Sequence, residues 1–155
     1  MIESGADNSI EISFTLSCPE SPADLARIEQ MLSWAAKREG IAGELGIWLC
    51  TDDEIADLHL RYMDIDGATD VITFPEDAPD AGGYLGDIAV SVDTATAQSE
   101  DAGHGAAREV AYLCLHGMLH IAGYDDLDNE ARARMLARQE DLLNEFERDH
   151  PGSWG

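Results

Sequence analysis

The sequence contains very little positive charge. Of its 155 residues, 32 are Asp or Glu and only 9 are Lys or Arg, giving a formal net charge of −23, and Lys37 is the single lysine. Such a surface repels nucleic acids, other polyanions and membranes through its long-range field. Acid excess with almost no lysine suggests adaptation to a salty cytoplasm, where screening shortens this repulsion to a few ångströms. A partner protein with a basic face is the second explanation.

Long apolar runs and cysteine are also scarce. No apolar stretch approaches the ~20 residues that span a bilayer, and residues 1–7 lack the basic start and apolar run of a signal peptide, so we expect a cytoplasmic protein with no membrane partner. Cys18, Cys50 and Cys114 are widely spaced and contain no Cys-x-x-Cys pair. Cys50 and Cys114 lie in apolar runs and are predicted to be buried thiols, so neither a disulfide nor a thiolate zinc site is supported.

The order of apolar patterns predicts one domain over residues 1–155, with an ordered core of about 9–148. Alternating segments and short apolar runs predict strands, and apolar residues at helical spacing between capping residues predict helices. The expected strands are 10–16, 44–50, 71–74 and 87–92, and the expected helices are 21–40, 51–62, 93–101, 106–122 and 128–146. Their order indicates an α+β fold with a single small mixed sheet of about four strands packed with helices. The long apolar segment 110–121 predicts that helix 106–122 lies in the core, buried against that sheet. The tail after residue 150 is expected to be frayed.

The most informative segment is His116-Gly-Met-Leu-His120, in the predicted helix 106–122. Histidines four residues apart lie on one helix face and can both reach one cation, as in zincin-like metal helices. Gly123 can take positive φ and end the helix, which leaves Asp125 and Asp126 where a third ligand is needed. Three protein ligands leave a metal position for water, as in catalytic sites. The alternative is that two histidines merely share a helix face.

Gly117 follows the first histidine directly. In the metalloprotease motif His-Glu-x-x-His, this position holds the glutamate that acts as general base. A protease mechanism of that type is therefore disfavoured. The glycine leaves room beside a metal ion, or it permits close packing of the helix.

With these elements in order, the chain resembles the YbeY family of bacterial metal-dependent endoribonucleases, also called rRNA maturation factors. The family's zinc motif is His-Gly-x-Leu-His-x-x-Gly-Tyr-Asp-His, and residues 116–125 follow it without a gap. Thr69-Asp-Val-Ile-Thr-Phe-Pro75 is similar to the family's Thr-Asp-Val-Leu-Ser-Phe-Pro, and Gly86-Asp-Ile to its Gly-Asp-Ile segment. The resemblance covers roughly residues 44–126, and it suggests that Thr69 and Asp70 lie near the cleft.

The resemblance implies that His116 and His120 bind zinc and that Asp126 occupies the place of a third histidine. Aspartate is a competent zinc ligand. Its negative charge makes the metal a weaker Lewis acid, and oxygen ligation favours harder ions such as Mn²⁺. Asp125 is a candidate to hold a metal-bound histidine through a hydrogen bond, or it is a polar cap that ends the helix.

A second departure from the family concerns positive charge. Met63 stands where the family usually has an arginine near the active site, and Arg61 would point about 200° away from position 63 on a helix. Because methionine cannot hold an anion, position 63 does not contribute to positioning a phosphate. His59 takes the place of a family asparagine; it could form a similar hydrogen bond, approach the site, or be a simple polar helix residue.

Three arginines of the last predicted helix, Arg132, Arg134 and Arg138, could touch RNA. Glu130 and Asp141 can pair with them on the helix surface, and a solvated charged face is the favoured interpretation.

The resemblance thus implies a single-strand-specific, metal-dependent endoribonuclease in rRNA processing and ribosome maturation. One Zn²⁺ per chain is expected, with Mn²⁺ as the alternative. The expected partners are single-stranded RNA or rRNA and the small ribosomal subunit or its proteins, with no DNA. Two alternatives remain: a non-catalytic metal-binding ribosome assembly factor, and a metal-dependent hydrolase of a peptide or small phosphoester.

Overall fold

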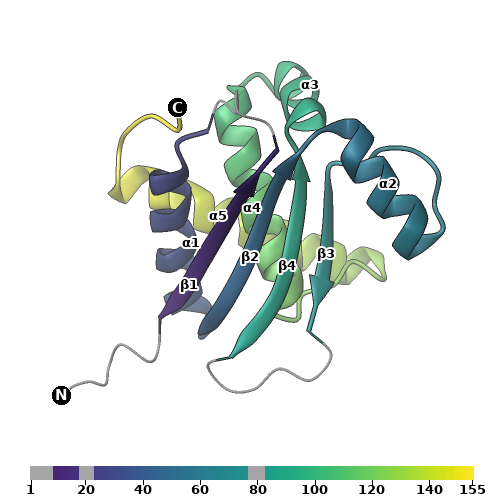
Figure 1. The fold of residues 1–155 in the computed structure, drawn as a ribbon. Coiled ribbons are helices and arrows are strands. Elements are labelled where there is room, and N and C mark those ends of the chain that lie inside the picture. Colours follow the sequence, from purple (N-terminus) through teal and green to yellow (C-terminus); the bar gives the residue numbers. More distant parts are fainter. Residues whose placement is uncertain (1–8, 18–22, 77–82) are drawn as a thin grey trace.

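A computed structural model describes residues 9–17, 23–76 and 83–155 (Figure 1). The strands are β1 (Ile10–Leu16), β2 (Gly43–Cys50), β3 (Val71–Pro75) and β4 (Tyr84–Ser91), and the helices are α1 (Leu25–Glu39), α2 (Asp52–Met63), α3 (Val92–Ala102), α4 (Ala106–Ile121) and α5 (Asn129–Asp149). The strands form one sheet in the order β1-β2-β4-β3. β1, β2 and β4 are parallel, and β3 pairs antiparallel with β4 at the edge. The predicted α+β fold with a small mixed sheet is confirmed.

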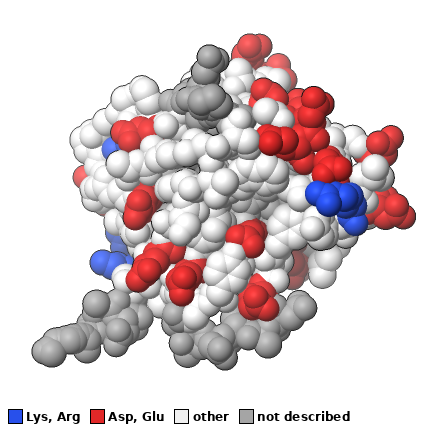
Figure 2. Space-filling view, in the orientation of Figure 1, with Lys and Arg blue, Asp and Glu red and all other residues white. Residues whose placement is uncertain are grey.

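Helices α1, α4 and α5 cover one face of the sheet (Figure 1). Side chains of a strand alternate between the two faces, which places Leu45, Ile47 and Leu49 of β2 against these helices, each at most 1% exposed. Figure 2 shows the opposite side of the molecule, where acidic side chains greatly outnumber basic ones. Among the helices of the described residues, none combines the length and apolar character that crossing a membrane requires.

Helix α4 lies in the core, as predicted for the helix that carries the histidines. Ala111, Cys114 and Leu115 are fully buried. A Cβ atom at Gly117 would lie 2.7 Å from Cγ2 of Ile88 on β4. Glycine therefore permits close packing of the helix on the sheet, which is one of the two roles considered for it.

The starts of the helices show which of the predicted capping residues cap a helix in the structure. The capping box of Thr51 and Glu54 forms as predicted. Ser91 rather than Asp93 caps α3, because its hydroxyl accepts from the Thr94 amide at 3.1 Å. Asp24 caps α1, whereas the predicted start at residue 21, like Cys18, lies outside the described residues.

The expectation of a frayed tail is wrong. α5 continues to residue 149, and Trp154 is only 6% exposed. The Trp154 carbonyl accepts from the Asp24 amide at 2.6 Å, and its indole donates to Glu147 Oε2 at 2.8 Å. A large apolar ring with a polar edge gains from burial when that edge finds a partner. The tail thereby closes over α1 and α5.

Candidate metal centre

The two histidines lie side by side near the end of α4. The ring centroids of His116 and His120 are 4.8 Å apart, with planes at 78°, and both side chains are half-buried. Gly123 has φ of 112°, and the Tyr124 amide donates back to the Leu119 carbonyl at 3.1 Å. The helix therefore ends in the glycine turn that the sequence predicts, and the chain doubles back toward the histidines.

A cavity of about 850 Å³ lies between the β3 edge of the sheet and α4, and both histidines line it. Asp126 lines the same cavity, so the three predicted ligands share one space. The remaining lining residues come from α2 and the loop after it, β3, α3, α4 and α5: His59, Met63, Ile65, Thr69, Asp70, Val71, Ile72, Thr73, Gln98, Glu109, Tyr112, Leu113, Arg132 and Leu136. The resemblance had placed Thr69 and Asp70 near the cleft, and both lie in its wall.

Hydrogen bonds to Gln139 of α5 fix the orientation and tautomer of His116. The Gln139 side-chain amide donates through Nε2 to the Tyr112 carbonyl at 3.1 Å. Its Oε1 must then face His116 Nδ1, 2.8 Å away. Because an amide oxygen only accepts, the proton is on Nδ1, and Nε2 of His116 keeps its lone pair for a ligand. Metal-bound histidines are commonly held in this way.

His120 is held in the form that a metal requires. Burial lowers the pKa of His120 below its ordinary value, and the neighbouring His116 lowers it further. Asp126 and Asp125 raise the pKa of His120 through their negative charges, but by less than burial lowers it. A neutral imidazole is the ligand form of histidine, so the histidine pair fits a divalent ion.

The third ligand is not assembled with the histidines. Within the residues that the structure describes, no group of three or more His, Cys, Asp or Glu side chains is gathered closely enough to hold a metal ion. Asp125 and Asp126 are exposed, and Asp125 Oδ1 accepts from the Leu127 amide at 3.1 Å. Ligation by Asp126, and support of a histidine by Asp125, therefore stay predictions.

Sequence reasoning missed Gln139. It is fully buried, and Met135 and Leu142 of the apolar stripe on α5 flank it along the helix. A polar residue in such a stripe must find a buried partner, and that was the available signal. The partner could not be read from the sequence, because His116 is 23 residues away.

The cavity wall near α2 contains Met63 and His59 but not Arg61. Arg61 pairs with Asp57 at 2.8 Å on the outer side of α2, so it points away from the cavity as the helical angle predicts. His59 Nδ1 lies 2.9 Å from the Gly67 carbonyl. His59 thus both approaches the site and ties down the following loop.

The three arginines of α5 behave differently from one another. Arg134 lies 4.0 Å from Glu130, which is the predicted surface pair. Arg138 instead binds Glu39 of α1 at 2.7 Å. Arg132 lines the histidine cavity. Arg132 and Arg134 are exposed, as a solvated charged face requires, whereas that interpretation is wrong for Arg138, because α5 crosses α1 there.

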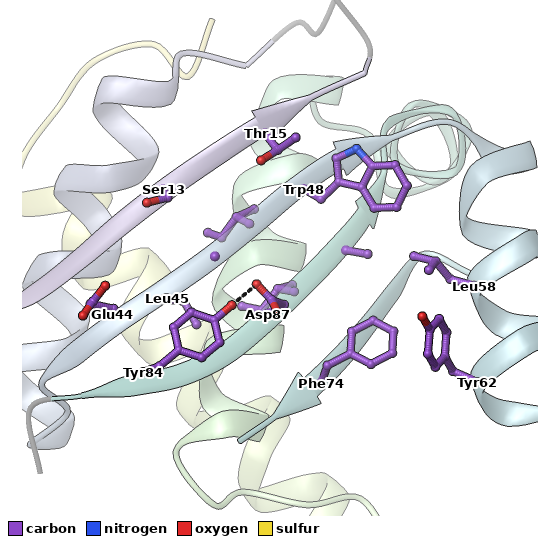
Figure 3. A pocket seen from close by; sticks show the side chains of 14 residues that line it. Ser13, Thr15, Glu44, Leu45, Trp48, Leu58, Tyr62, Phe74, Tyr84 and Asp87 are labelled. Carbon is purple, nitrogen blue, oxygen red and sulfur yellow. Dashed lines mark hydrogen bonds between the residues drawn. The ribbon is translucent and has the colours of Figure 1, made fainter. Parts of the chain in front are cut away.

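A second cavity, of about 620 Å³, lies on the open face of the sheet (Figure 3). Aromatic residues Trp48, Tyr62 and Phe74 line it, and Tyr84 donates a hydrogen bond to Asp87 there. Histidine and cysteine are absent from its described lining. The histidine cavity is therefore the candidate metal centre.

Comparison with known proteins agrees with the motifs of this site. Residues 18–147 match the family model described as Endoribonuclease YbeY. The chain belongs to the YbeY family. A relative named Endoribonuclease YbeY from Staphylococcus epidermidis is 41% identical over 79% of this chain and 86% of the relative. One from Chloroflexus aurantiacus is 43% identical over 64% of this chain and 71% of the relative.

The fold of this chain is also found among solved structures. The solution structure of TM1509 from Thermotoga maritima superposes with a TM-score of 0.60 and 24% identity, covering 93% of this chain and 99% of that one. The resemblance to YbeY that the motifs indicated is confirmed for the family, and the α+β architecture is confirmed for the fold.

Proposed function

We propose that this protein is a metal-dependent endoribonuclease that cleaves single-stranded RNA during rRNA processing. Membership of the YbeY family supports endoribonuclease activity. The observation that carries the metal dependence is the histidine pair, because His116 presents a free Nε2 and His120 is favoured in its neutral form. Asp126, in the same cavity, would complete the ligand set.

The residues would divide the chemistry as follows. A bound divalent ion supplies Lewis-acid polarisation of a phosphoryl oxygen and a water of lowered pKa. His116 and His120 would hold it through imidazole nitrogens, and Asp126 through an oxygen that tolerates Zn²⁺ or Mn²⁺. Gln139 keeps His116 in the productive tautomer. The cavity of about 850 Å³ beside β3 would admit part of a single strand.

The acidic surface bears on how RNA reaches the site. With a net charge of −23, the protein repels a polyanion unless salt screens the field or a basic partner bridges the two. We therefore propose that it acts in a salty cytoplasm and at the small ribosomal subunit, where basic ribosomal proteins supply that bridge.

Metal analysis and an RNA cleavage assay test this proposal. The purified protein should contain about one Zn²⁺ or Mn²⁺ per chain and cleave a labelled single-stranded RNA at high salt, and His120→Ala should lose both properties. Stoichiometric metal without RNA cleavage at any salt would favour a non-catalytic assembly factor. Cleavage of a peptide or a small phosphoester in place of RNA would favour the other alternative.

A further inference from the structure

Almost all of the positive charge in this protein is already engaged within the fold. Apart from Lys37 and Arg132, each basic side chain lies against an acidic group or a carbonyl in the structure; these are Arg27, Arg38, Arg61, Arg108, Arg134, Arg138 and Arg148. Lys37 is on α1, outside the histidine cavity. Arg132 remains as the cation available for an anionic ligand.

Arg132 is both exposed and without a side-chain partner among the described residues. It lies near the start of α5, and it is the one arginine or lysine among the described residues that line the histidine cavity. An arginine that forms no side-chain hydrogen bond or ion pair with another described residue, at the rim of a candidate catalytic cavity, is placed for ligand binding rather than for stability.

The charges in the cavity support this role. Asp70 accepts from the Gln98 amide at 3.2 Å and from the Val71 amide at 2.8 Å. Glu109 accepts from His104 at 2.6 Å. These two carboxylates have partners, so neither needs Arg132, and Asp126, the third carboxylate among the described lining residues, is the predicted metal ligand. A phosphodiester entering beside them requires a compensating cation, and guanidinium binds phosphate oxygens through two parallel hydrogen bonds.

We infer that Arg132 is the residue that binds the phosphodiester of an RNA strand in this cavity. This inference rests on the proposed function and names the substrate-binding group of the same site. It also accounts for Met63, since a cation on α5 supplies the positive charge that α2 does not bring to the cavity.

Paired arginine variants test the inference. Arg132→Ala should weaken binding of a single-stranded RNA to the metal-free protein, measured by fluorescence anisotropy, by roughly 10- to 100-fold, because a hydrogen-bonded charge contact is lost. The slope of the logarithm of the binding constant against the logarithm of the salt concentration should become shallower by about one, as expected for the loss of one phosphate contact. Arg134→Ala is the matched control, because Arg134 is two residues away and pairs with Glu130 instead. It should change affinity by less than about twofold, and Arg132→Lys should recover part of the loss.

The outcomes separate this inference from the proposed function. If the unsubstituted, metal-loaded protein cleaves RNA and the Arg132→Ala variant binds and cleaves RNA equally well, the inference is overturned while the proposed function stands. If the original does not cleave RNA, but Arg132→Ala weakens RNA binding and Arg134→Ala does not, the inference stands while the function fails. Equal losses in both alanine variants would indicate general charge attraction and overturn the inference. Thermal unfolding of both variants should match the original.

Discussion

Replacement of Gln139 by leucine tests the arrangement of the metal centre in the absence of metal. Gln139 is fully buried, and leucine removes the donor to the Tyr112 carbonyl and the acceptor for His116 Nδ1. A buried polar group that loses its hydrogen-bond partner lowers the stability of the protein by about 1–3 kcal/mol. Each of the two lost hydrogen bonds should cost an amount near the lower limit of this range, because His116 is half-buried and Tyr112 lies within a hydrogen-bonded helix. We expect the free energy of unfolding to fall by about 2 kcal/mol.

The tautomer of His116 gives a more direct measurement. Long-range proton–nitrogen NMR of the unsubstituted, metal-free protein should show His116 protonated at Nδ1. In the Gln139→Leu variant, the tautomer equilibrium of His116 should shift toward protonation at Nε2. Zinc affinity should fall by roughly 10- to 100-fold, as on loss of the hydrogen bond that orients a metal-bound histidine. Gln139→Glu keeps the acceptor for His116 and should retain the tautomer, although it loses the donor to Tyr112.

Gln98→Leu provides the matched control. Gln98 lines the same cavity, and its amide donates to Asp70 at 3.2 Å. This variant should leave the His116 spectrum and zinc affinity unchanged. If Gln139→Leu also leaves the His116 tautomer unchanged, the reasoning from the amide orientation is refuted.

Three further predictions concern packing, pH and charge. Gly117→Ala should destabilise by about 1–2 kcal/mol, because overpacking against buried Ile88 exceeds the roughly 1 kcal/mol that alanine gains in a helix; greater stability in urea would contradict this. Arg108 lowers the pKa of Glu147 in the folded protein. The stability that this ion pair contributes is therefore fully present above the unfolded pKa of glutamate, about 4.3, and is lost as the pH falls through the lower pKa of the folded state. The Glu147→Gln variant should therefore have a lower free energy of unfolding than the unchanged protein at pH 7, and this difference should shrink in acid. A difference that does not vary with pH would count against the pairing. Met63→Arg adds a guanidinium to the cavity wall and should restore RNA binding to Arg132→Ala by roughly tenfold; no gain in anisotropy titrations would show that position 63 does not reach the RNA.

The parts of the fold predicted from sequence are those set by local chemistry. The capping box at Thr51, the alternation of β1 and the glycine turn after His120 all depend on residues near one another in the chain. Burial of Cys50 and Cys114 followed from their apolar surroundings and is confirmed. The start of β4 at residue 84, three residues before the prediction, follows from its pairing with β2.

The features that sequence reasoning missed depend on contacts between distant segments. Trp154 reaches Asp24 across most of the length of the chain. Arg138 binds Glu39, 99 residues away, instead of a neighbour on its own helix. Spacing along one helix gives no information about which other helix will cross it. For the same reason, the histidine pair was predicted, but its support from α5 was not.

The contribution of α5 to the cavity limits what the histidine motif can do by itself. Residues 116–126 provide the candidate ligands, but Gln139 and Arg132 both come from the helix that follows. A chimera that transplants the motif to the helix of another protein would carry two imidazoles with free rotation and no anion receptor. Transfer of the activity would require both helices, kept at the same crossing.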